Sequence, residues 1–137
     1  MKTYKPKNSS QLQRLMDKLF KERGLDGDFN DIDTSEIVDM SYLFIGKVNF
    51  NGDISKWDVS NVEYMTATFF GLDVFNCDIS QWDMSKVKDT KRMFKNTVKF
   101  NQDLSGWNLS SVVESDEMFK GSFIEKYESV WFPELYI

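Results

Sequence analysis

Aspartate is the residue whose chemistry and spacing first suggest a functional site in this chain. It recurs at a 25-residue interval, at Asp28, Asp53, Asp78 and Asp103. Stacked carboxylates could collect Ca²⁺, which takes about six to eight oxygen ligands in proteins. Carboxylates one repeat apart also repel one another, whereas Asp and Asn side chains in turns accept hydrogen bonds from nearby backbone amides. We therefore expect these aspartates to stabilise turns and not to bind a metal.

The acidic stretch DGDFNDIDTSE, residues 26–36, begins like a calcium-binding EF-hand loop. Asp26, Asp28 and Asn30 stand at the first, third and fifth loop positions, which supply oxygen ligands. Asp31 then stands where the loop requires glycine, and Ile37 stands where it requires a bidentate glutamate. The stretch fails as an EF-hand, and we expect no metal or cofactor in this protein.

Nucleophilic catalysis has little support in the sequence. Cys77 is the single cysteine, and a nucleophilic thiol needs a base beside it. The chain contains no histidine, which is the commonest general base and metal ligand. No carboxylate spacing singles out the acid pair of a glycosidase. We predict that Cys77 is exposed in a turn and has no chemical role, and that the protein is not an enzyme.

These residues belong to a repeated phrase, so a repeated structure must position them. FNGDISKWDVS, FNCDISQWDMS and FNQDLSGWNLS begin at Phe50, Phe75 and Phe100. Extending the phrase in both directions defines four units, which are 25–49, 50–74, 75–99 and 100–124. We number the positions within each unit from 1 to 25. A period of this length is typical of a solenoid, in which each coil covers the apolar face of the next.

Within each unit the pattern predicts one strand and one helix. Positions 8 to 10 alternate apolar, polar, apolar (WDV, WDM, WNL), which is typical of a short half-buried strand. Serine at position 11 is a candidate helix N-cap, followed at helical spacing by apolar residues at positions 13 and 20 and, in the first two units, methionine at 16. Glycine or asparagine at position 22 suits a left-handed C-cap. We therefore predict an α/β solenoid, leucine-rich-repeat-like, of four strand-turn-helix coils that curve with their strands on the concave side.

Tryptophan recurs at position 8, as Trp57, Trp82 and Trp107. A column of indoles can serve as an aromatic ladder for sugars or bases. Because position 8 alternates with a polar residue at position 9, the pattern favours burial of the column in the core.

Both ends of the repeat have candidate caps. Residues 1–24 contain cap residues, an apolar stripe at helical spacing and a final glycine, which predicts an N-terminal cap helix. Residues 125–137 break the repeat and are rich in aromatic side chains, which predicts an aromatic C-terminal cap. We expect residues 1–137 to form a single repeat domain.

These motifs resemble the BspA-like leucine-rich-repeat family of bacterial surface proteins. The resemblance rests on FNGDISKWDVSNV, with KPKNSSQLQRL and IDTSEIVDMSYLF before it, and it extends over residues 5–124. It implies a leucine-rich-repeat-like fold that binds proteins of a host or a neighbouring cell. It implies no catalysis and no cofactor, and taken alone it suggests a location at the cell surface.

Charge is divided unevenly along the chain, whose net formal charge is −5. Residues 1–24 hold seven Lys/Arg against two Asp/Glu, and the remainder has a balance of −10. A surface this acidic repels a nucleic-acid backbone, so we expect no direct nucleic-acid binding. No apolar run is long enough to span a membrane and no signal peptide is recognisable, so we expect a cytoplasmic monomer without membrane contact.

The side chains that face outward from the predicted strands are the candidate partner-binding site. They stand at positions 7 and 9, and they are Asp31, Asp33, Lys56, Asp58, Gln81, Asp83, Gly106 and Asn108. Because five of these eight are Asp or Asn and one is basic, a protein partner with a basic surface would suit them. We predict a non-enzymatic protein–protein interaction module that binds through the concave strand face of an acidic solenoid. The alternative is a small acidic intracellular inhibitor or nucleic-acid mimic, such as a phage-encoded anti-defence protein that blocks a nucleic-acid-binding channel.

Overall fold

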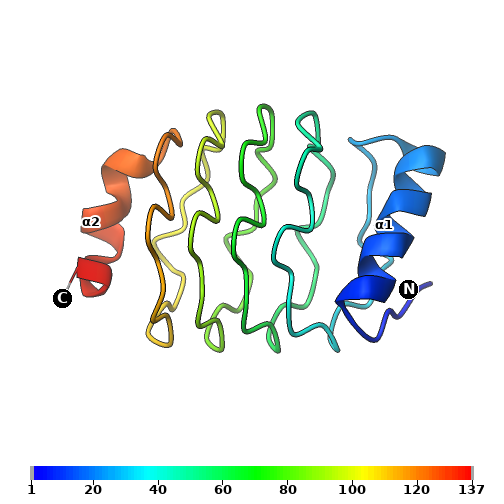
Figure 1. Ribbon diagram of the computed structural model, residues 1–137, viewed down its shortest axis with the longest axis horizontal. Coiled ribbons are helices and arrows are strands. Elements are labelled where there is room, and N and C mark those ends of the chain that lie inside the picture. The colour runs from blue at the N-terminus through cyan, green and yellow to red at the C-terminus, as the bar shows by residue number, and fades with distance from the viewer. Residues whose placement is uncertain (1, 137) are drawn as a thin grey trace.

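A computed structural model describes residues 2–136 and shows a row of stacked coils with helices at both ends (Figure 1). Helix α1 (Ser9–Arg23) lies across one end of the row. The other end is closed by the 3₁₀ helix η1 (Glu125–Tyr127), helix α2 (Glu128–Trp131) and the 3₁₀ helix η2 (Pro133–Tyr136). Between the two ends, residues at the same position of successive 25-residue units lie side by side, so each unit forms one coil.

The predicted α/β solenoid of leucine-rich-repeat-like, strand-turn-helix coils is wrong. Within residues 2–136 no strand forms, and the only helices are those of the two ends. Neighbouring coils are joined by isolated parallel bridges, of which the longest series runs through Asp39, Tyr64, Asp89 and Glu114. The coils also lie in a straight row, so the concave strand face expected from the sequence has no counterpart (Figure 1).

The segment predicted to be helical is a chain of successive turns. In the second coil the amides of Phe70 and Leu72 donate to carbonyls three residues earlier, as in β-turns. The amides of Ala67, Phe69 and Gly71 donate instead to the next coil, with N···O distances of 2.9, 2.9 and 2.8 Å. The backbone amides of this segment are therefore satisfied alternately within the coil and across to its neighbour, where a helix would satisfy them all internally.

Backbone conformation and spacing explain why no helix forms. Positions 18 and 22 of every coil have a positive φ, which a right-handed helix does not allow. They are Tyr42, Ala67, Arg92 and Glu117 at position 18, and Gly46, Gly71, Asn96 and Gly121 at position 22. The phenyl rings of successive coils lie 5.4 to 5.8 Å apart, whereas packed helices need about 8–10 Å between their axes. Coils stacked this closely leave no room for a helix in each.

The predicted serine N-cap also has a different role. The amide of Ser60 donates to the Asp58 carboxylate at 2.9 Å, and the amide of Ser85 donates in the same way to Asp83 at 3.0 Å. Position 11 therefore ends an Asx turn that begins at position 9. No helix follows it.

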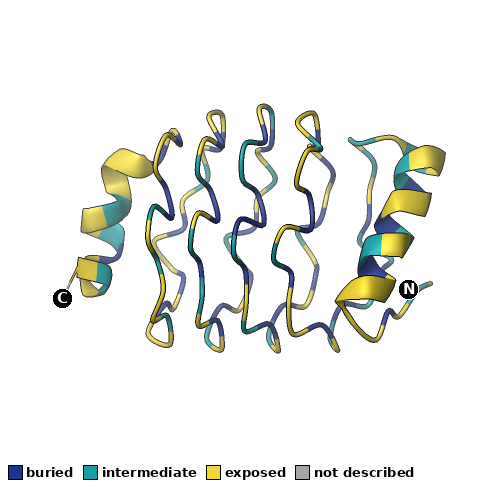
Figure 2. Cartoon of the chain, in the orientation of Figure 1, coloured by how far each residue is buried: buried dark blue, intermediate teal, exposed yellow. Residues whose placement is uncertain are grey.

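Aromatic columns form the core of the stack. Phenylalanines at positions 1 and 20 stack on their equivalents in adjacent coils, as Phe69 does on Phe94 with ring centroids 5.4 Å apart. The three tryptophans at position 8 are buried, as predicted, and each indole N–H donates to a carbonyl of the preceding coil. Buried and exposed residues alternate along each coil because inward side chains fill this core (Figure 2).

The N-terminal and C-terminal caps cover the outermost coils of the stack. Leu12, Met16 and Leu19 of α1 are fully buried against the first coil, and the helix ends before Gly24 as the sequence predicted. At the other end the ring of Phe132 stacks on Phe119 with centroids 6.0 Å apart. No helix among the described residues is long and apolar enough to cross a membrane.

Candidate interaction surfaces

The aspartates at positions 4 and 9 form Asx turns along one side of the stack. Asp53, Asp78 and Asp103 each accept the backbone amide of the serine two residues later, at 2.9 to 3.0 Å. Asp58 and Asp83 do the same at position 9, and Asn108 makes the equivalent bond in the fourth coil. The prediction that the position 4 aspartates stabilise turns is confirmed. We call the side chains at positions 4, 7 and 9 the Asx face.

These hydrogen bonds keep the Asx face negatively charged. Bonds from the serine two residues later lower the pKa of Asp53, Asp78, Asp83 and Asp103 below the usual aspartate value. A carboxylate that accepts such bonds is stabilised in its ionised form. These four groups therefore carry full charge at neutral pH. The Asx turns alone explain why aspartate recurs at these positions, so the recurrence does not by itself indicate a binding site.

The predicted partner-binding residues divide into two groups. Asp31 forms a bidentate ion pair with Arg23 of α1, at 2.8 and 3.0 Å, and this bond lowers the pKa of Asp31. Asp33 lies 3.8 Å from Lys5 of the N-terminal segment. Both carboxylates are half-buried and form ion pairs with the N-terminal cap, so they are less available to a partner. The remaining predicted residues are exposed, and they are Lys56, Asp58, Gln81, Asp83, Gly106 and Asn108.

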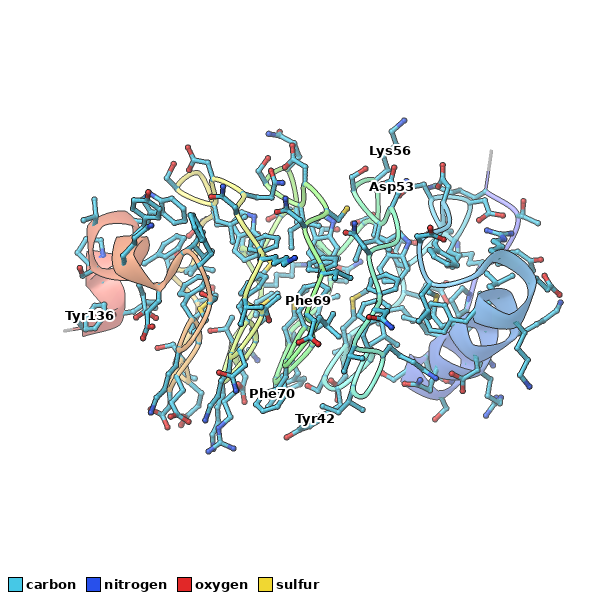
Figure 3. All side chains as sticks on the ribbon, turned by 90° about the horizontal axis from the view of Figure 1, so that it is seen from above. Tyr42, Asp53, Lys56, Phe69, Phe70 and Tyr136 are labelled. Atoms are coloured by element: carbon cyan, nitrogen blue, oxygen red, sulfur yellow. The ribbon has the colours of Figure 1, made fainter. Side chains whose placement is uncertain are left out.

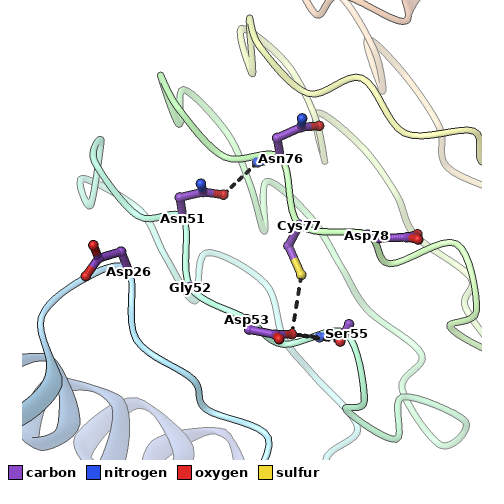
Figure 4. A pocket seen from close by; sticks show the side chains of 8 residues that line it. All are labelled: Asp26, Asn51, Gly52, Asp53, Ser55, Asn76, Cys77 and Asp78. Carbon is purple, nitrogen blue, oxygen red and sulfur yellow. Dashed lines mark hydrogen bonds between the residues drawn. The ribbon is translucent and has the colours of Figure 1, made fainter.

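A depression of about 320 Å³ lies between the first three coils beside Cys77 (Figure 4). Cys77 is half-buried and not exposed as predicted, with Sγ 3.9 Å from Oδ1 of Asp53. Burial, assisted by the negative charges of Asp53 and Asp78, raises the pKa of Cys77 to about 11. The thiol is therefore protonated at neutral pH and is a poor nucleophile. Among residues 2–136 no group of three His, Cys, Asp or Glu side chains is placed to hold a metal ion.

The opposite side of the stack carries exposed apolar side chains in the first two coils. Tyr42, Ile45, Val38 and Tyr64 are 52, 49, 43 and 42% exposed, and Phe70 is half-buried beside them at position 21. Figure 3 shows Tyr42 and Phe70 on the side of the stack away from Asp53 and Lys56. We call these five residues the aromatic patch. Exposed aromatic and aliphatic side chains that gather on one side of a folded domain are candidate interaction sites.

The repeat itself shows that folding does not require the aromatic patch. Position 18 is Tyr42 in the first coil but Arg92 in the third, with φ of 60° and 55°. Position 21 is Ile45 in the first coil and Lys95 in the third. The same backbone therefore accepts charged residues at both positions.

In the last two coils these positions form an ion cluster. Glu117 lies 3.1 Å from Arg92, 3.0 Å from Lys95 and 3.0 Å from Lys120. Hydrogen bonds from the three cations lower the pKa of Glu117 to about 2. Sequence reasoning missed this contrast because it assigned positions 18 and 21 to a helix. A column-by-column comparison of these two positions would have revealed it.

Residues 14–131 match a protein family described as "Mycoplasma protein of unknown function, DUF285". The chain belongs to this family. The match takes in all four coils of the DUF285 chain, the part of α1 from residue 14 onward, and the C-terminal cap as far as the end of α2. No curated protein and no solved structure matches the chain significantly.

Proposed function

We propose that this DUF285 chain is a non-enzymatic protein-binding module whose anchor is the aromatic patch. The observation that supports this most strongly is the contrast between coils at positions 18 and 21. Tyr42 and Ile45 occupy positions where the same fold uses Arg92 and Lys95, so packing does not account for them. Exposed aromatic and aliphatic side chains gain binding energy when a partner removes them from water, and tyrosine is enriched at energetically dominant interface positions.

The resemblance to the BspA-like family, which is more specific than the DUF285 match, supports the same proposal. We infer that the chain is related to the BspA-like bacterial surface proteins, on the strength of the recurrent FN-x-D-x-S-x-W phrase. Such proteins bind other proteins and carry out no catalysis. A non-enzymatic role is also supported by the protonated Cys77 thiol and by the absence of histidine from the sequence.

The Asx face is the second candidate surface. Asp58, Asp83 and their neighbours present fixed negative charge, which attracts a basic protein surface and speeds association. The same charge is the basis of the alternative function, an acidic intracellular inhibitor that occupies a nucleic-acid-binding channel. That alternative predicts that the partner binds nucleic acid and that added DNA displaces the chain.

A pull-down with two matched variants tests the proposal. The first variant, the coil-3 graft, carries Tyr42→Arg and Ile45→Lys, the residues that the third coil uses at these positions. The second carries Asp58→Asn and Asp83→Asn, which preserves the Asx turns because Asn108 makes the same bond in the fourth coil. Both variants should fold as the wild type does, since each borrows residues that the repeat already accepts.

The immobilised wild type should retain a partner that mass spectrometry identifies, and the coil-3 graft should lose it. Separate cytosolic and surface-protein extracts would distinguish the two locations suggested by the sequence. If only the Asx variant fails to retain the partner, the binding site is the Asx face and not the aromatic patch. Displacement by DNA would favour the inhibitor.

A further inference from the structure

The segments that close the two ends of the stack carry opposite charge. Residues 2–24, which form the N-terminal cap, hold seven Lys/Arg and two Asp/Glu. Residues 113–136, which form the end of the fourth coil and the C-terminal cap, hold six Asp/Glu and two Lys. These segments lie at opposite ends of the row of coils (Figure 1), and their charge balances are +5 and −4. The first coil, residues 25–49, lies against the N-terminal cap and holds six Asp/Glu and one Lys, so the excess of cations at this end is confined to the cap.

The positive charge at the N-terminal end is presented on the outer surface of α1. Arg14, Lys18 and Lys21 are exposed and are separated by four and three residues, which places them on one face of the helix. Leu12, Met16 and Leu19 occupy the opposite face and are buried against the first coil. The outer face of α1 therefore carries three cations on long apolar stems, with the exposed carboxylates of Asp17 and Glu22 beside them and Glu22 4.0 Å from Lys18.

The C-terminal end presents aromatic and acidic side chains together. Val130 and Tyr136 are 75 and 60% exposed, and Tyr127 is 38% exposed. Glu125 and Glu134 are exposed among them. This end therefore combines apolar area with negative charge, whereas the outer face of α1 combines cations with aliphatic stems.

We infer that the outer face of α1 in one molecule docks on the C-terminal cap of a second copy of this chain. Opposite charge attracts the two outer surfaces to each other, and a cation gains further attraction from the exposed ring of Tyr136. The ring of Tyr127 is already stacked on Trp131 and has Lys126 over it. The two surfaces are different parts of the molecule, so a docked pair still has one free basic end and one free acidic end. Such a head-to-tail contact does not close at a dimer and builds open rows of molecules. It differs from the monomer expected from the sequence.

Two charge-reversed variants give a decisive test with purified 1–137 chain. The N-reversed variant carries Arg14→Glu and Lys21→Glu, two exposed positions of α1. The C-reversed variant carries Glu125→Lys and Glu134→Lys. Glu125 accepts one exposed hydrogen bond from the amide of Gly121, so a thermal melt of each variant serves as the folding control. Sedimentation equilibrium then measures the average molar mass against concentration.

The wild type should exceed its monomer mass of 16.1 kDa at low salt, and the mass should rise continuously with concentration. It should return to the monomer value in about 1 M salt, where screening shortens the range of charge interactions to about 3 Å. Each variant alone should associate at least about tenfold more weakly, because like charges then face each other. An equimolar mixture of the two variants should associate again, since the N-reversed acidic α1 matches the C-reversed basic cap.

Three results would overturn the inference. They are a wild type that stays at 16.1 kDa at all concentrations in low salt, a mass that stops at twice this value, and folded variants whose mixture fails to associate. None of these results bears on the pull-down, because self-association and partner binding are measured separately.

Discussion

Replacing Trp82 by alanine should remove a large part of the protein's stability. Trp82 lies in the middle of the stack and its side chain is 4% exposed. Its ring lies 5.9 Å from the ring of Phe69 in the preceding coil, and its indole N–H donates to the carbonyl of Ile54 at 3.2 Å. The substitution therefore opens a cavity between two coils and removes one of the two hydrogen bonds that the Ile54 carbonyl accepts, the other coming from the amide of Trp57.

The expected loss follows from these two effects. Large-to-alanine changes of buried aromatic residues cost about 3–5 kcal/mol, and the loss of a typical hydrogen bond costs about 1 kcal/mol. Trp82→Ala should thus lower the free energy of unfolding by about 4–6 kcal/mol. Trp82→Phe keeps most of the apolar volume and loses the hydrogen bond, so it should cost about 1–2 kcal/mol.

Urea denaturation followed by circular dichroism measures both changes. The alanine variant should unfold at a much lower urea concentration than the phenylalanine variant, with the wild type highest. A loss below about 1 kcal/mol for Trp82→Ala, which is the range of surface substitutions, would refute the buried aromatic core. The tryptophan column would then be an exposed ladder available to ligands.

Three further predictions concern packing, reactivity and pH. Gly52→Ala should destabilise the protein by about 1–3 kcal/mol in denaturant melts, because its Cβ would lie 2.5 Å from the Phe29 ring, whereas Gly106→Ala meets no atom within 4 Å and should be tolerated. Cys77, with a pKa near 11, should react with a thiol reagent at pH 8 at least about tenfold faster after unfolding than in the native protein. The pKa of Glu117 falls from 4.5 to about 2 on folding, so its stabilisation is complete above pH 4.5 and disappears as the pH falls toward 2. The melting temperature should decline over that interval, and Glu117→Gln should decline less; equal declines would contradict the role of the ion cluster.

The period and the core positions of this fold were accessible from sequence, whereas its local conformation was not. Phe69 and Trp82 could be placed in the core because apolar columns repeat at fixed positions. Positions 16 and 20 also face inward in a chain of turns, so their spacing imitates a helix. The left-handed residues at position 18 are Tyr42, Ala67, Arg92 and Glu117, none of which is the glycine or asparagine that normally marks this conformation.

The remaining failure lies in long-range geometry. The distance between stacked coils excludes a helix, as the positive φ at positions 18 and 22 does, and that distance depends on how rings such as Phe69 and Phe94 pack on each other. The Asx face could be anticipated, because Asp and Asn before serine carry a local turn signal. The aromatic patch could not be assigned to a surface until positions 18 and 21 were known to face outward.

Binding by the coil-3 graft is the most direct test of the proposed function. Once the pull-down has identified a partner, its dissociation constant should be measured by calorimetry for the wild type and for the graft carrying Tyr42→Arg and Ile45→Lys. Removal of an interface anchor commonly costs about 2 kcal/mol or more, so the graft should bind at least about 30-fold more weakly while melting at the wild-type temperature. A folded graft that binds with wild-type affinity would contradict the claim that the aromatic patch is the binding site.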